Sequence, residues 1–492
     1  MDFFLVKSLE KRKKADALVL PFWQKNKGVE PAADCSGVMS HIKPLLSAGD
    51  FKGRKGETVV LYPGGVKEYR MILLGLGKKK DVSLETFRYS YSALVKVCHK
   101  KKKIQSLNMV FPQHFCMKEA VRGLAEGLFL TNYTFDELKQ SSLEKAPVLL
   151  EKITFIAAER SVLASVRKAE SLCDGVKLAR DLVNANADKV TPQYLATFAK
   201  GLSKRFSNVK TTVFNKNRIE KEGMGLFLAV NRGSSNDPAF IIMEYKGAPR
   251  SKDRTVLVGK GVTYDTGGLN LKPTGSIETM KCDMAGSAAA FGTLFAAATM
   301  SLKVNLTIVV AATENSIDAK SYKPGDVYRG YAGKTVEIGN TDAEGRLTLA
   351  DALAYSVSKL SPTRIIDLAT LTGAIVIALG EETIGIMSND DDLASKLSYA
   401  GEVSYERVCR LPLYEEYREQ LKSEIADLNN VGGRSGGSIT AGVFLQEFVG
   451  KIPWVHCDIA GTAYLSKARR YNPKNATGSG VRLMIEFLES LT

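Results

Sequence analysis

The sequence lacks the cysteine and histidine patterns on which disulfide-rich proteins and histidine-based metal sites depend. Its seven cysteines are scattered, odd in number and include no CxxC pair, which indicates reduced thiols in a cytosolic setting. Its four histidines form no HExxH or HxH cluster. Any metal site in this chain of 492 residues must therefore be built mainly from carboxylates.

Long apolar runs are also missing. The N-terminal apolar run has four residues and precedes the first basic cluster, whereas a signal peptide has the reverse order and about 7–15 apolar residues. Residues 284–300 are apolar but short and rich in alanine and glycine, so they predict a buried helix rather than a membrane span. We therefore expect no membrane association and a cytoplasmic location.

The composition, with 45% hydrophobic and 25% charged residues, is typical of a folded globular protein and excludes disordered, collagen-like and coiled-coil chains. The net charge of +15 is concentrated near the N-terminus, where residues 1–110 contain 22 Lys and Arg but only 10 Asp and Glu. This asymmetry predicts an N-terminal unit with a basic face.

Residues 1–160 are predicted to form a first α/β domain. Helical patterns at 84–96 and 116–130 lie between short apolar runs, and this alternation favours a mostly parallel sheet. The predicted strands are residues 17–20, 58–62, 71–74, 106–111 and 152–156.

The helix-prone segment 161–182 is predicted to connect this domain to a second, larger α/β domain over 183–492. Thr191 followed by Pro192 is typical of a helix start. The strongest strand signals of the second domain are residues 255–258, 306–311, 335–338, 363–368 and 454–459, and a last helix is predicted at 480–488.

Polar residues concentrate where two of these strands are expected to end. Lys260 and Asp265 are expected at or just past the end of the strand 255–258, followed by Lys272 and Asp283. Ligands of open α/β sheets bind at the carboxyl edge of the strands. These four side chains therefore form a first candidate cluster.

A second candidate cluster follows the predicted strand 335–338. Asp342 and Glu344 alternate, so both can face the same side if the segment is extended. Arg346 comes next, and a helical pattern begins at Leu347.

If the two clusters meet, four carboxylates share one pocket and repel one another unless cations neutralise them. Two divalent ions would do so, and would also lower the pKa of a shared water and polarise a carbonyl oxygen, as amide hydrolysis near neutral pH requires. Arg346 and a lysine could stabilise the oxyanion or hold a small anion. Alternatively, Asp283 and Asp342 are helix N-caps and Lys260 is a solvated loop residue.

Several segments together resemble one family. NTDAEGRL at 340–347 resembles the signature octapeptide of the leucyl aminopeptidases, the cytosolic di-zinc family, and the segment at 259–290 resembles that family's other metal-binding block. Further similar segments are ARDLVNANADKVTPQYLA, DLATLTGA, IADLNNVGGRSGGSITAGVFLQEFV, WVHCDIAGTA and ATGSGVR. The resemblance covers essentially all of 171–492, whereas 1–160 shows only a general α/β pattern.

The resemblance implies a pair of divalent metal ions, Zn or Mn with Mg as a further option, and it places their ligands at Lys260, Asp265, Asp283, Asp342 and Glu344. A lysine can ligate only as a neutral amine, so a nearby dication must lower its pKa. The alternative for Lys260 is a salt bridge to one of the carboxylates.

The resemblance also implies two catalytic side chains. Lys272 would polarise the scissile carbonyl, and Arg346 would anchor a bicarbonate that acts as general base. The alternatives are a surface lysine and an arginine that neutralises Glu344. The implied pocket for the first substrate side chain is small and apolar, with ordinary core packing as the alternative, and consists of Met280, Thr370, Gly373, Ala460 and Ala463.

The implied fold has a smaller, macro-like N-terminal α/β domain and a larger C-terminal metallopeptidase domain with a central mixed sheet. The implied enzyme is a homohexamer that releases an N-terminal residue, preferably Leu, from peptides with a free N-terminus.

An alternative function is that of a DNA-binding accessory or regulatory protein acting through the basic N-terminal domain, although Lys100–Lys103 has no interleaved aromatics. A two-metal phosphatase or nuclease is a third reading, but a lysine ligand would be unexpected there.

Overall fold

The structure is a computed structural model that describes residues 1–492 except 101–102, 113–116, 140–146, 158 and 160. Lys101, Lys102 and Cys116, which belong to the predicted basic run and helix, lie outside the described residues. The chain divides into an N-terminal unit, made of Met1–Cys173 and Lys467–Pro473, and a C-terminal unit, made of Asp174–Ser466 and Lys474–Thr492.

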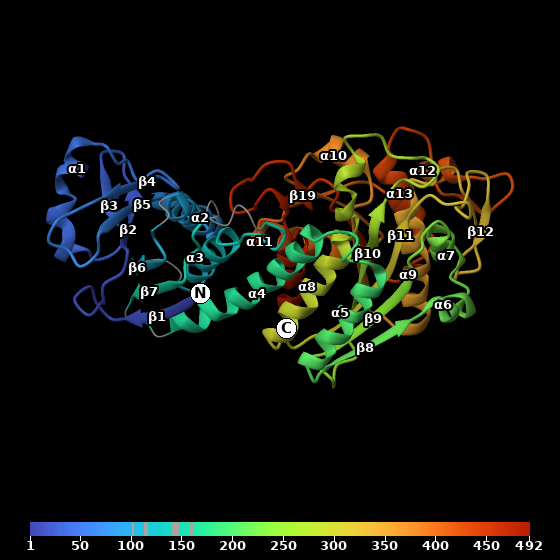
Figure 1. Ribbon diagram of the computed structural model, residues 1–492, viewed down its shortest axis with the longest axis horizontal. Helices are drawn as coiled ribbons and strands as arrows, with labels where there is room; N and C mark the ends of the chain where they lie inside the picture. Colours follow the sequence, from blue (N-terminus) through green and yellow to red (C-terminus); the bar gives the residue numbers. More distant parts are fainter. Residues whose placement is uncertain (101–102, 113–116, 140–146, 158, 160) are drawn as a thin grey trace. The chain divides into compact units, whose positions relative to one another are not determined.

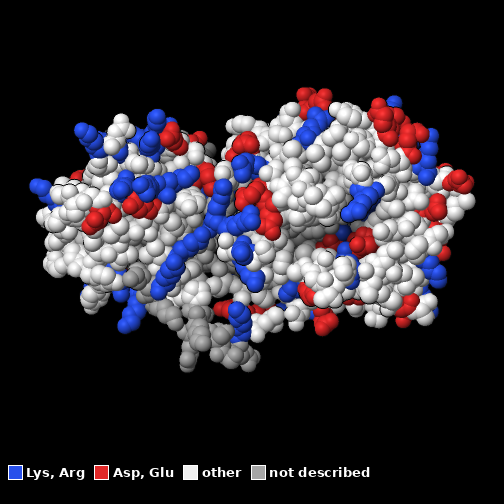
Figure 2. Space-filling model, turned by 90° about the horizontal axis from the view of Figure 1, so that it is seen from above, with Lys and Arg blue, Asp and Glu red and all other residues white. Residues whose placement is uncertain are grey.

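The division falls within helix α4, Ser161–Asn184, which occupies the segment predicted to connect the two domains. The domain boundaries that we place at residues 160 and 182 remain a prediction. In Figure 2, Lys and Arg side chains outnumber Asp and Glu side chains over the part of the surface that the N-terminal unit forms, at left.

The N-terminal unit is built on one sheet with the strand order β1-β7-β6-β2-β5-β4, and β3 pairs with β2. All pairs are parallel except β4–β5 and β2–β3, so the sheet is mostly parallel, as predicted. The strands are β1 Asp2–Val6, β2 Ala17–Gln24, β3 Val29–Pro31, β4 Thr58–Leu61, β5 Arg70–Lys78, β6 Ser106–Val110 and β7 Lys152–Ile156. Strands β1 and β3 were not predicted.

Alternation of side chains places two hydrophobic layers on this sheet. Val19 and Ile72 belong to the layer that packs with α2, Leu84–Lys100, and α3, Met117–Thr131. Their neighbours in sequence belong to the layer on the opposite face, which includes residues of the 3-10 helix Ser36–His41 and of α1, Lys43–Ala48. This is the pattern expected of a sheet covered on both faces.

The C-terminal unit contains an eight-stranded mixed sheet with the order β16-β15-β18-β14-β10-β11-β9-β8. Its four central strands β18, β14, β10 and β11 are parallel, and both flanks contain antiparallel pairs. The strands are β8 Val209–Phe214, β9 Ala239–Lys246, β10 Thr255–Asp265, β11 Asn305–Asn315, β14 Arg364–Ala369, β15 Ile384–Ser388, β16 Val408–Arg410 and β18 Trp454–Asp458. Strands β8, β9, β15 and β16 were not predicted.

Helices cover both faces of this sheet. Helix α8, Ala285–Thr299, and helix α9, Glu344–Leu360, lie on opposite sides of β10 and β11 (Figure 1). The other helices of the unit are α5 Pro192–Arg205, α6 Lys216–Glu222, α7 Gly225–Asn231, α10 Gly373–Leu379, α11 Asp391–Ser404, α12 Glu415–Arg418, α13 Gly437–Gln446 and α14 Val481–Glu489. As predicted, the Thr191 hydroxyl caps α5 by accepting a hydrogen bond from the Tyr194 N–H at 3.2 Å.

Helix α8 is the buried helix predicted from its alanine and glycine content. Its small residues admit close neighbours: a Cβ at Gly286 would lie 2.0 Å from the backbone oxygen of Leu368 in β14. In the described part of the chain, no helix is both long enough and apolar enough to cross a membrane.

The C-terminal unit also contains a small three-stranded sheet. It joins β12 Val327–Arg329, β13 Thr335–Glu337 and β17 Leu428–Asn429, and β13 pairs with β17 in parallel. A further pair, β19 Tyr464–Leu465 and β20 Asn475–Ala476, lies near the end of the chain.

Candidate functional site

The first predicted cluster lies further inside the sheet than expected. Strand β10 does not end near Val258 but continues to Asp265, so Lys260 is a strand residue with only 3% of its surface exposed. The chain then passes through the loop with Lys272 into the 3-10 helix Ile277–Met284, which contains Asp283.

Lys260 is the centre of a buried ion cluster. Its Nζ lies 2.7 Å from both carboxylate oxygens of Asp283 and 2.8 Å from Oε1 of Glu344. It also donates a hydrogen bond of 2.9 Å to the backbone oxygen of Thr370. The two predicted clusters therefore meet, because Glu344 belongs to the second one.

Lys272 occupies a second, shallower ion cluster. Its Nζ lies 2.9 Å from Oδ2 of Asp265 and 2.6 Å from Oδ1 of Asp342, and its side chain is 16% exposed. Oxygen atoms of Asp265, Asp342 and Glu344 all lie within 4.8 Å of one another. These three carboxylates link the two lysines into one site.

The helix-cap alternative for the aspartates is wrong. Helix α8 begins after Met284 and helix α9 after Ala343, and neither N-cap residue makes a side-chain capping bond. The segment of Asp342 and Glu344 is not extended, because Asp342 lies in a turn. The helix start predicted at Leu347 is wrong, because α9 begins at Glu344.

Hydrogen bonds hold the two loops of the site against each other. Asn315 at the end of β11 donates to Oδ1 of Asp265 at 2.8 Å and to the backbone oxygen of Thr341 at 3.0 Å. The Thr341 hydroxyl donates to the backbone oxygen of Gly267 at 2.7 Å and accepts from the Asn270 N–H at 2.9 Å. Sequence reasoning gave no role to these buried amides and hydroxyls, since residue type alone shows no chemistry for them.

Burial makes it costly to charge most of the site's carboxylates. It raises the pKa of Asp265 to about 6 and the pKa of Asp283 well above its usual value, and the negative charge of Glu344 adds to both effects. The pKa of Asp342 is raised for the same two reasons. Burial alone would also raise the pKa of Glu344, but Lys260 and Lys272 hold it below its usual value.

The donor set suits a divalent cation. Among the described residues, Oε2 of Glu344 has no hydrogen-bond partner although the residue is only 1% exposed. A buried carboxylate oxygen without a donor is costly, and its site contains three further carboxylates. Oxygen-rich sites of this kind accept Zn²⁺, Mn²⁺ or Mg²⁺.

Arg346 lies on the same helix turn as Glu344 and is 7% exposed. Its Nη1 donates a hydrogen bond of 2.7 Å to the backbone oxygen of Asn430. Burial lowers the pKa of Arg346 to about 10, although Glu344 and Asp458 oppose this change. Its Nε has no partner within the described parts of the chain, so the guanidinium retains a free donor.

The residues predicted to form the substrate pocket lie in three segments. Thr370 is beside the ion cluster, because its hydroxyl donates to Oδ1 of Asp283 at 2.8 Å. Gly373, the first residue of α10, is exposed, Met280 and Ala460 are half-buried, and Ala463 is buried.

Buried Asp458, which was not predicted, joins two of these segments. It accepts hydrogen bonds from the N–H groups of Leu371 at 3.1 Å and Ala460 at 3.2 Å, and from the Thr372 hydroxyl at 2.7 Å.

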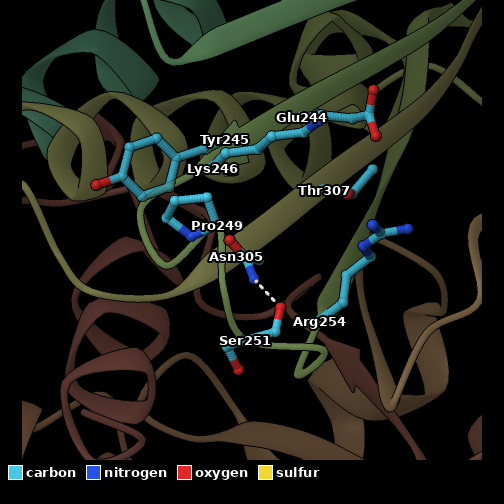
Figure 3. Close-up of a pocket in the computed structure, with 8 residues that line it drawn as sticks. All are labelled: Glu244, Tyr245, Lys246, Pro249, Ser251, Arg254, Asn305 and Thr307. Atoms are coloured by element: carbon cyan, nitrogen blue, oxygen red, sulfur yellow. Dashed lines mark hydrogen bonds between the residues drawn. The ribbon is translucent and has the colours of Figure 1, made fainter.

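A separate cavity of about 190 Å³ lies at the opposite edge of the sheet, where β9 ends and β11 begins (Figure 3). The amide of Asn305 in its lining donates to the backbone oxygens of Ala248 at 2.8 Å and Ser251 at 3.0 Å. None of the twelve predicted site residues, all of which the structure describes, lines this cavity.

Comparison with known proteins identifies the family on both parts of the chain. Residues 177–485 match the catalytic domain of the cytosol aminopeptidase family, and residues 19–142 match the N-terminal domain of that family. A "Probable cytosol aminopeptidase" of Protochlamydia amoebophila is 56% identical, covering 100% of this chain and 99% of the relative. One of Chlamydia felis is 46% identical, covering 97% of each.

Similar solved structures support the same family. A mutant of tomato leucine aminopeptidase is 32% identical with a TM-score of 0.88, covering 100% of this chain and 96% of the other. The bottromycin maturation enzyme BotP, also solved in complex with Mn, is 31% identical with a TM-score of 0.85, covering 97% and 99%. These matches favour the peptidase over the nucleic-acid-binding alternative. The chain, a two-domain α/β hydrolase that acts as a peptidase, belongs to the cytosol aminopeptidase family.

Proposed function

We propose that this peptidase is a metallo-aminopeptidase that releases the N-terminal residue, preferably Leu or one of similar size, from peptides with a free N-terminus. The observation that carries the proposal is the convergence of Asp265, Asp342 and Glu344 within 4.8 Å, next to the buried pair of Lys260 and Asp283. Lys260 and Lys272 offset only part of the charge of the four carboxylates, and the remaining repulsion is costly unless a further cation neutralises it.

The residues that would hold two divalent ions, Zn²⁺ or Mn²⁺ with Mg²⁺ as a further option, are Lys260, Asp265, Asp283, Asp342 and Glu344. The raised pKa values of three of these carboxylates and the unpartnered Oε2 of Glu344 among the described residues support this assignment. When bound, the ions would lower the pKa of a water molecule and polarise the substrate carbonyl.

The two lysines differ in depth, and this difference supports different roles. Lys260, with 3% of its side chain exposed, is too deep to touch a substrate. Burial alone would lower its pKa, but Asp283 and Glu344 raise it, so a neutral ligating amine requires a cation among these carboxylates. Lys272 is shallower, so its ammonium could donate a hydrogen bond to the scissile carbonyl and stabilise the developing oxyanion.

Arg346 would hold a small anion such as bicarbonate through its guanidinium. Its free Nε within the described residues and its position two residues after Glu344 support this role. Bicarbonate, when bound, would supply a general base, a group that none of the site's side chains obviously provides.

The pocket for the first substrate side chain would be formed by Met280, Thr370, Gly373, Ala460 and Ala463. Small side chains at four of these positions leave room for a Leu-sized group. Asp458 accepts hydrogen bonds from Leu371, next to Thr370, and from Ala460, which supports a pocket wall formed by both segments.

The enzyme would act in the cytoplasm, as the names of its relatives suggest. It would form a homohexamer, which sedimentation velocity can test.

The proposal is tested by hydrolysis of Leu-p-nitroanilide. We expect activity to disappear after chelation and to return when Zn²⁺ or Mn²⁺ is added. Glu344→Ala should stay inactive after metal addition, whereas the control Glu415→Ala, at a surface carboxylate whose side chain is 78% exposed, should behave like the wild type. A fully active Glu344→Ala enzyme would refute the site.

A further inference from the structure

Asn430 is a buried asparagine that bonds to the loop of Asp342 with every polar atom of its side chain. It follows β17 and has 0% of its surface exposed. Its Oδ1 accepts hydrogen bonds from the N–H groups of Gly339 at 2.8 Å and Asn340 at 3.2 Å. Its Nδ2 donates to the backbone oxygen of Asn340 at 2.7 Å. A side-chain amide offers the donor and the acceptor that this arrangement uses on two separate atoms.

The backbone of the same residue reaches the other side of the site. Its N–H donates to the backbone oxygen of Glu337 in β13 at 2.9 Å. Its carbonyl oxygen accepts the 2.7 Å hydrogen bond from Nη1 of Arg346. Asn430 therefore contacts both the segment before Asp342 and the guanidinium after Glu344.

The Asp342 loop depends on such bonds because it lies outside helices and strands. The N–H of Asp342 donates to Oδ1 of Asn340 at 2.7 Å, and Thr341 is bonded to the loop of Gly267 and Asn270. The loop is thus held on one side by Thr341 and on the other by Asn430. Loss of either would leave buried polar groups without partners.

We propose that Asn430 is a positioning residue that fixes Asp342 and Arg346 relative to each other. The inference rests on the proposed function, because it assumes that Asp342 holds a metal ion and that Arg346 acts in hydrolysis. Small displacements of such groups reduce turnover strongly, since about 1 Å of misplacement can cost about a hundredfold.

The test compares Asn430→Ala with Asn429→Ala. Asn429 is the adjacent residue, and its Oδ1 accepts a local hydrogen bond from the Val431 N–H at 3.1 Å, so the control removes a bond within its own segment. We expect Asn430→Ala to lower kcat about tenfold to a hundredfold with little change in KM, and to weaken Mn²⁺ binding measured by calorimetry. Asn429→Ala should keep both values close to wild type.

A folded Asn430→Ala protein, as judged by its thermal unfolding, with wild-type kcat and Mn²⁺ affinity would overturn the proposal. If this variant does not fold, Asn430→Asp replaces it, because the carboxylate keeps the acceptor for Gly339 and Asn340, loses the donor to the Asn340 carbonyl and adds a negative charge. Wild-type kcat in Asn430→Asp would equally overturn it. Failure of the wild-type enzyme itself to bind Mn²⁺ and to cleave Leu-p-nitroanilide would instead refute the proposed function.

Discussion

Nζ of Lys260 lies 2.8 Å from Oε1 of Glu344, and this ion pair joins strand β10 to the first turn of helix α9. Gly345 makes the approach possible, because a Cβ there would lie 2.4 Å from Cε of the lysine. The two side chains are 3% and 2% exposed. The segments 259–290 and 340–347 therefore meet in the interior of the protein. From the sequence alone, we could say only what would follow if they met.

Replacing Lys260 by arginine distinguishes a metal ligand from an ion-pair partner. Lys260→Arg keeps the positive charge, but arginine does not lose its proton and cannot act as a neutral amine ligand. We expect Mn²⁺ binding, measured by calorimetry, to weaken at least about tenfold, as for removal of other groups that support a metal. Lys260→Met, which removes charge and ligand together, should weaken binding as well. Wild-type affinity in Lys260→Arg would show that the lysine serves only as an ion-pair partner.

Replacing Lys272 should affect turnover without emptying the metal site. Loss of one oxyanion donor typically lowers kcat about 10²–10³-fold, and we expect Lys272→Met to fall in this range. Its metal content, measured by mass spectrometry of the elements, should match that of the wild type. The control is Lys422→Met, at a lysine whose side chain is 71% exposed. A kcat within a factor of two of wild type would exclude a catalytic role for Lys272.

A larger side chain at Gly373 tests the substrate pocket. A Cβ at this position meets no heavy atom within 4 Å, so Gly373→Val should fold normally. If the position lines the pocket, the added methyl groups take space from the substrate, and differences of this size are worth about 1–3 kcal/mol. We expect kcat/KM for Leu-p-nitroanilide to fall about tenfold more than kcat/KM for Ala-p-nitroanilide. Equal losses on both substrates would remove Gly373 from the pocket.

A buried pair between strands β14 and β18 predicts a pH-dependent stability. Nδ1 of His456 lies 2.6 Å from Oδ1 of Asp367, and the Trp454 indole N–H donates to the other oxygen at 2.8 Å. Burial alone would lower the pKa of His456, but Asp367 raises it. A raised histidine pKa contributes stability that is complete below the unfolded value of about 6.5 and is lost as pH rises through the folded value.

His456→Gln should therefore lower the free energy of unfolding most at low pH, by roughly 3–5 kcal/mol for a broken buried pair. The difference from wild type should shrink as pH rises above about 6.5. Urea unfolding at several pH values measures it, with His41→Gln at an exposed histidine as the control. A difference that stays constant with pH would mean that the imidazole is not charged in the folded protein.

The sequence predicted the type of both units. It also predicted which charged residues the structure brings together better than it predicted the helices and strands that contain them. The glycine-rich stretch after Val258 has the composition of a turn, but Gly259 and Gly261 are strand residues. A Cβ at Gly259 would lie 2.6 Å from Cα of Ser287 in helix α8, and a Cβ at Gly261 would lie 2.7 Å from a side-chain atom of Val310 in β11. Glycine here permits close packing, which a single sequence cannot distinguish from turn formation.

The residues that hold the site together were not predictable by the same reasoning. Asn315, Thr341 and Asn430 act through backbone groups of distant segments, so their pairing depends on the fold rather than on local pattern. The carboxylates were singled out because they form a dense series among glycine-rich segments, where strands were expected to end. Asn and Thr carry no such signal, and Asp458 was overlooked because it stands alone at the end of a strand.

The most direct test of the account is the number of divalent ions that the wild-type protein binds. Protein stripped with a chelator is titrated with Mn²⁺ or Zn²⁺ by calorimetry, and the bound metal is counted by elemental mass spectrometry. We expect two ions per chain in the wild type and fewer in Glu344→Ala. A folded wild-type protein that binds neither metal would contradict it.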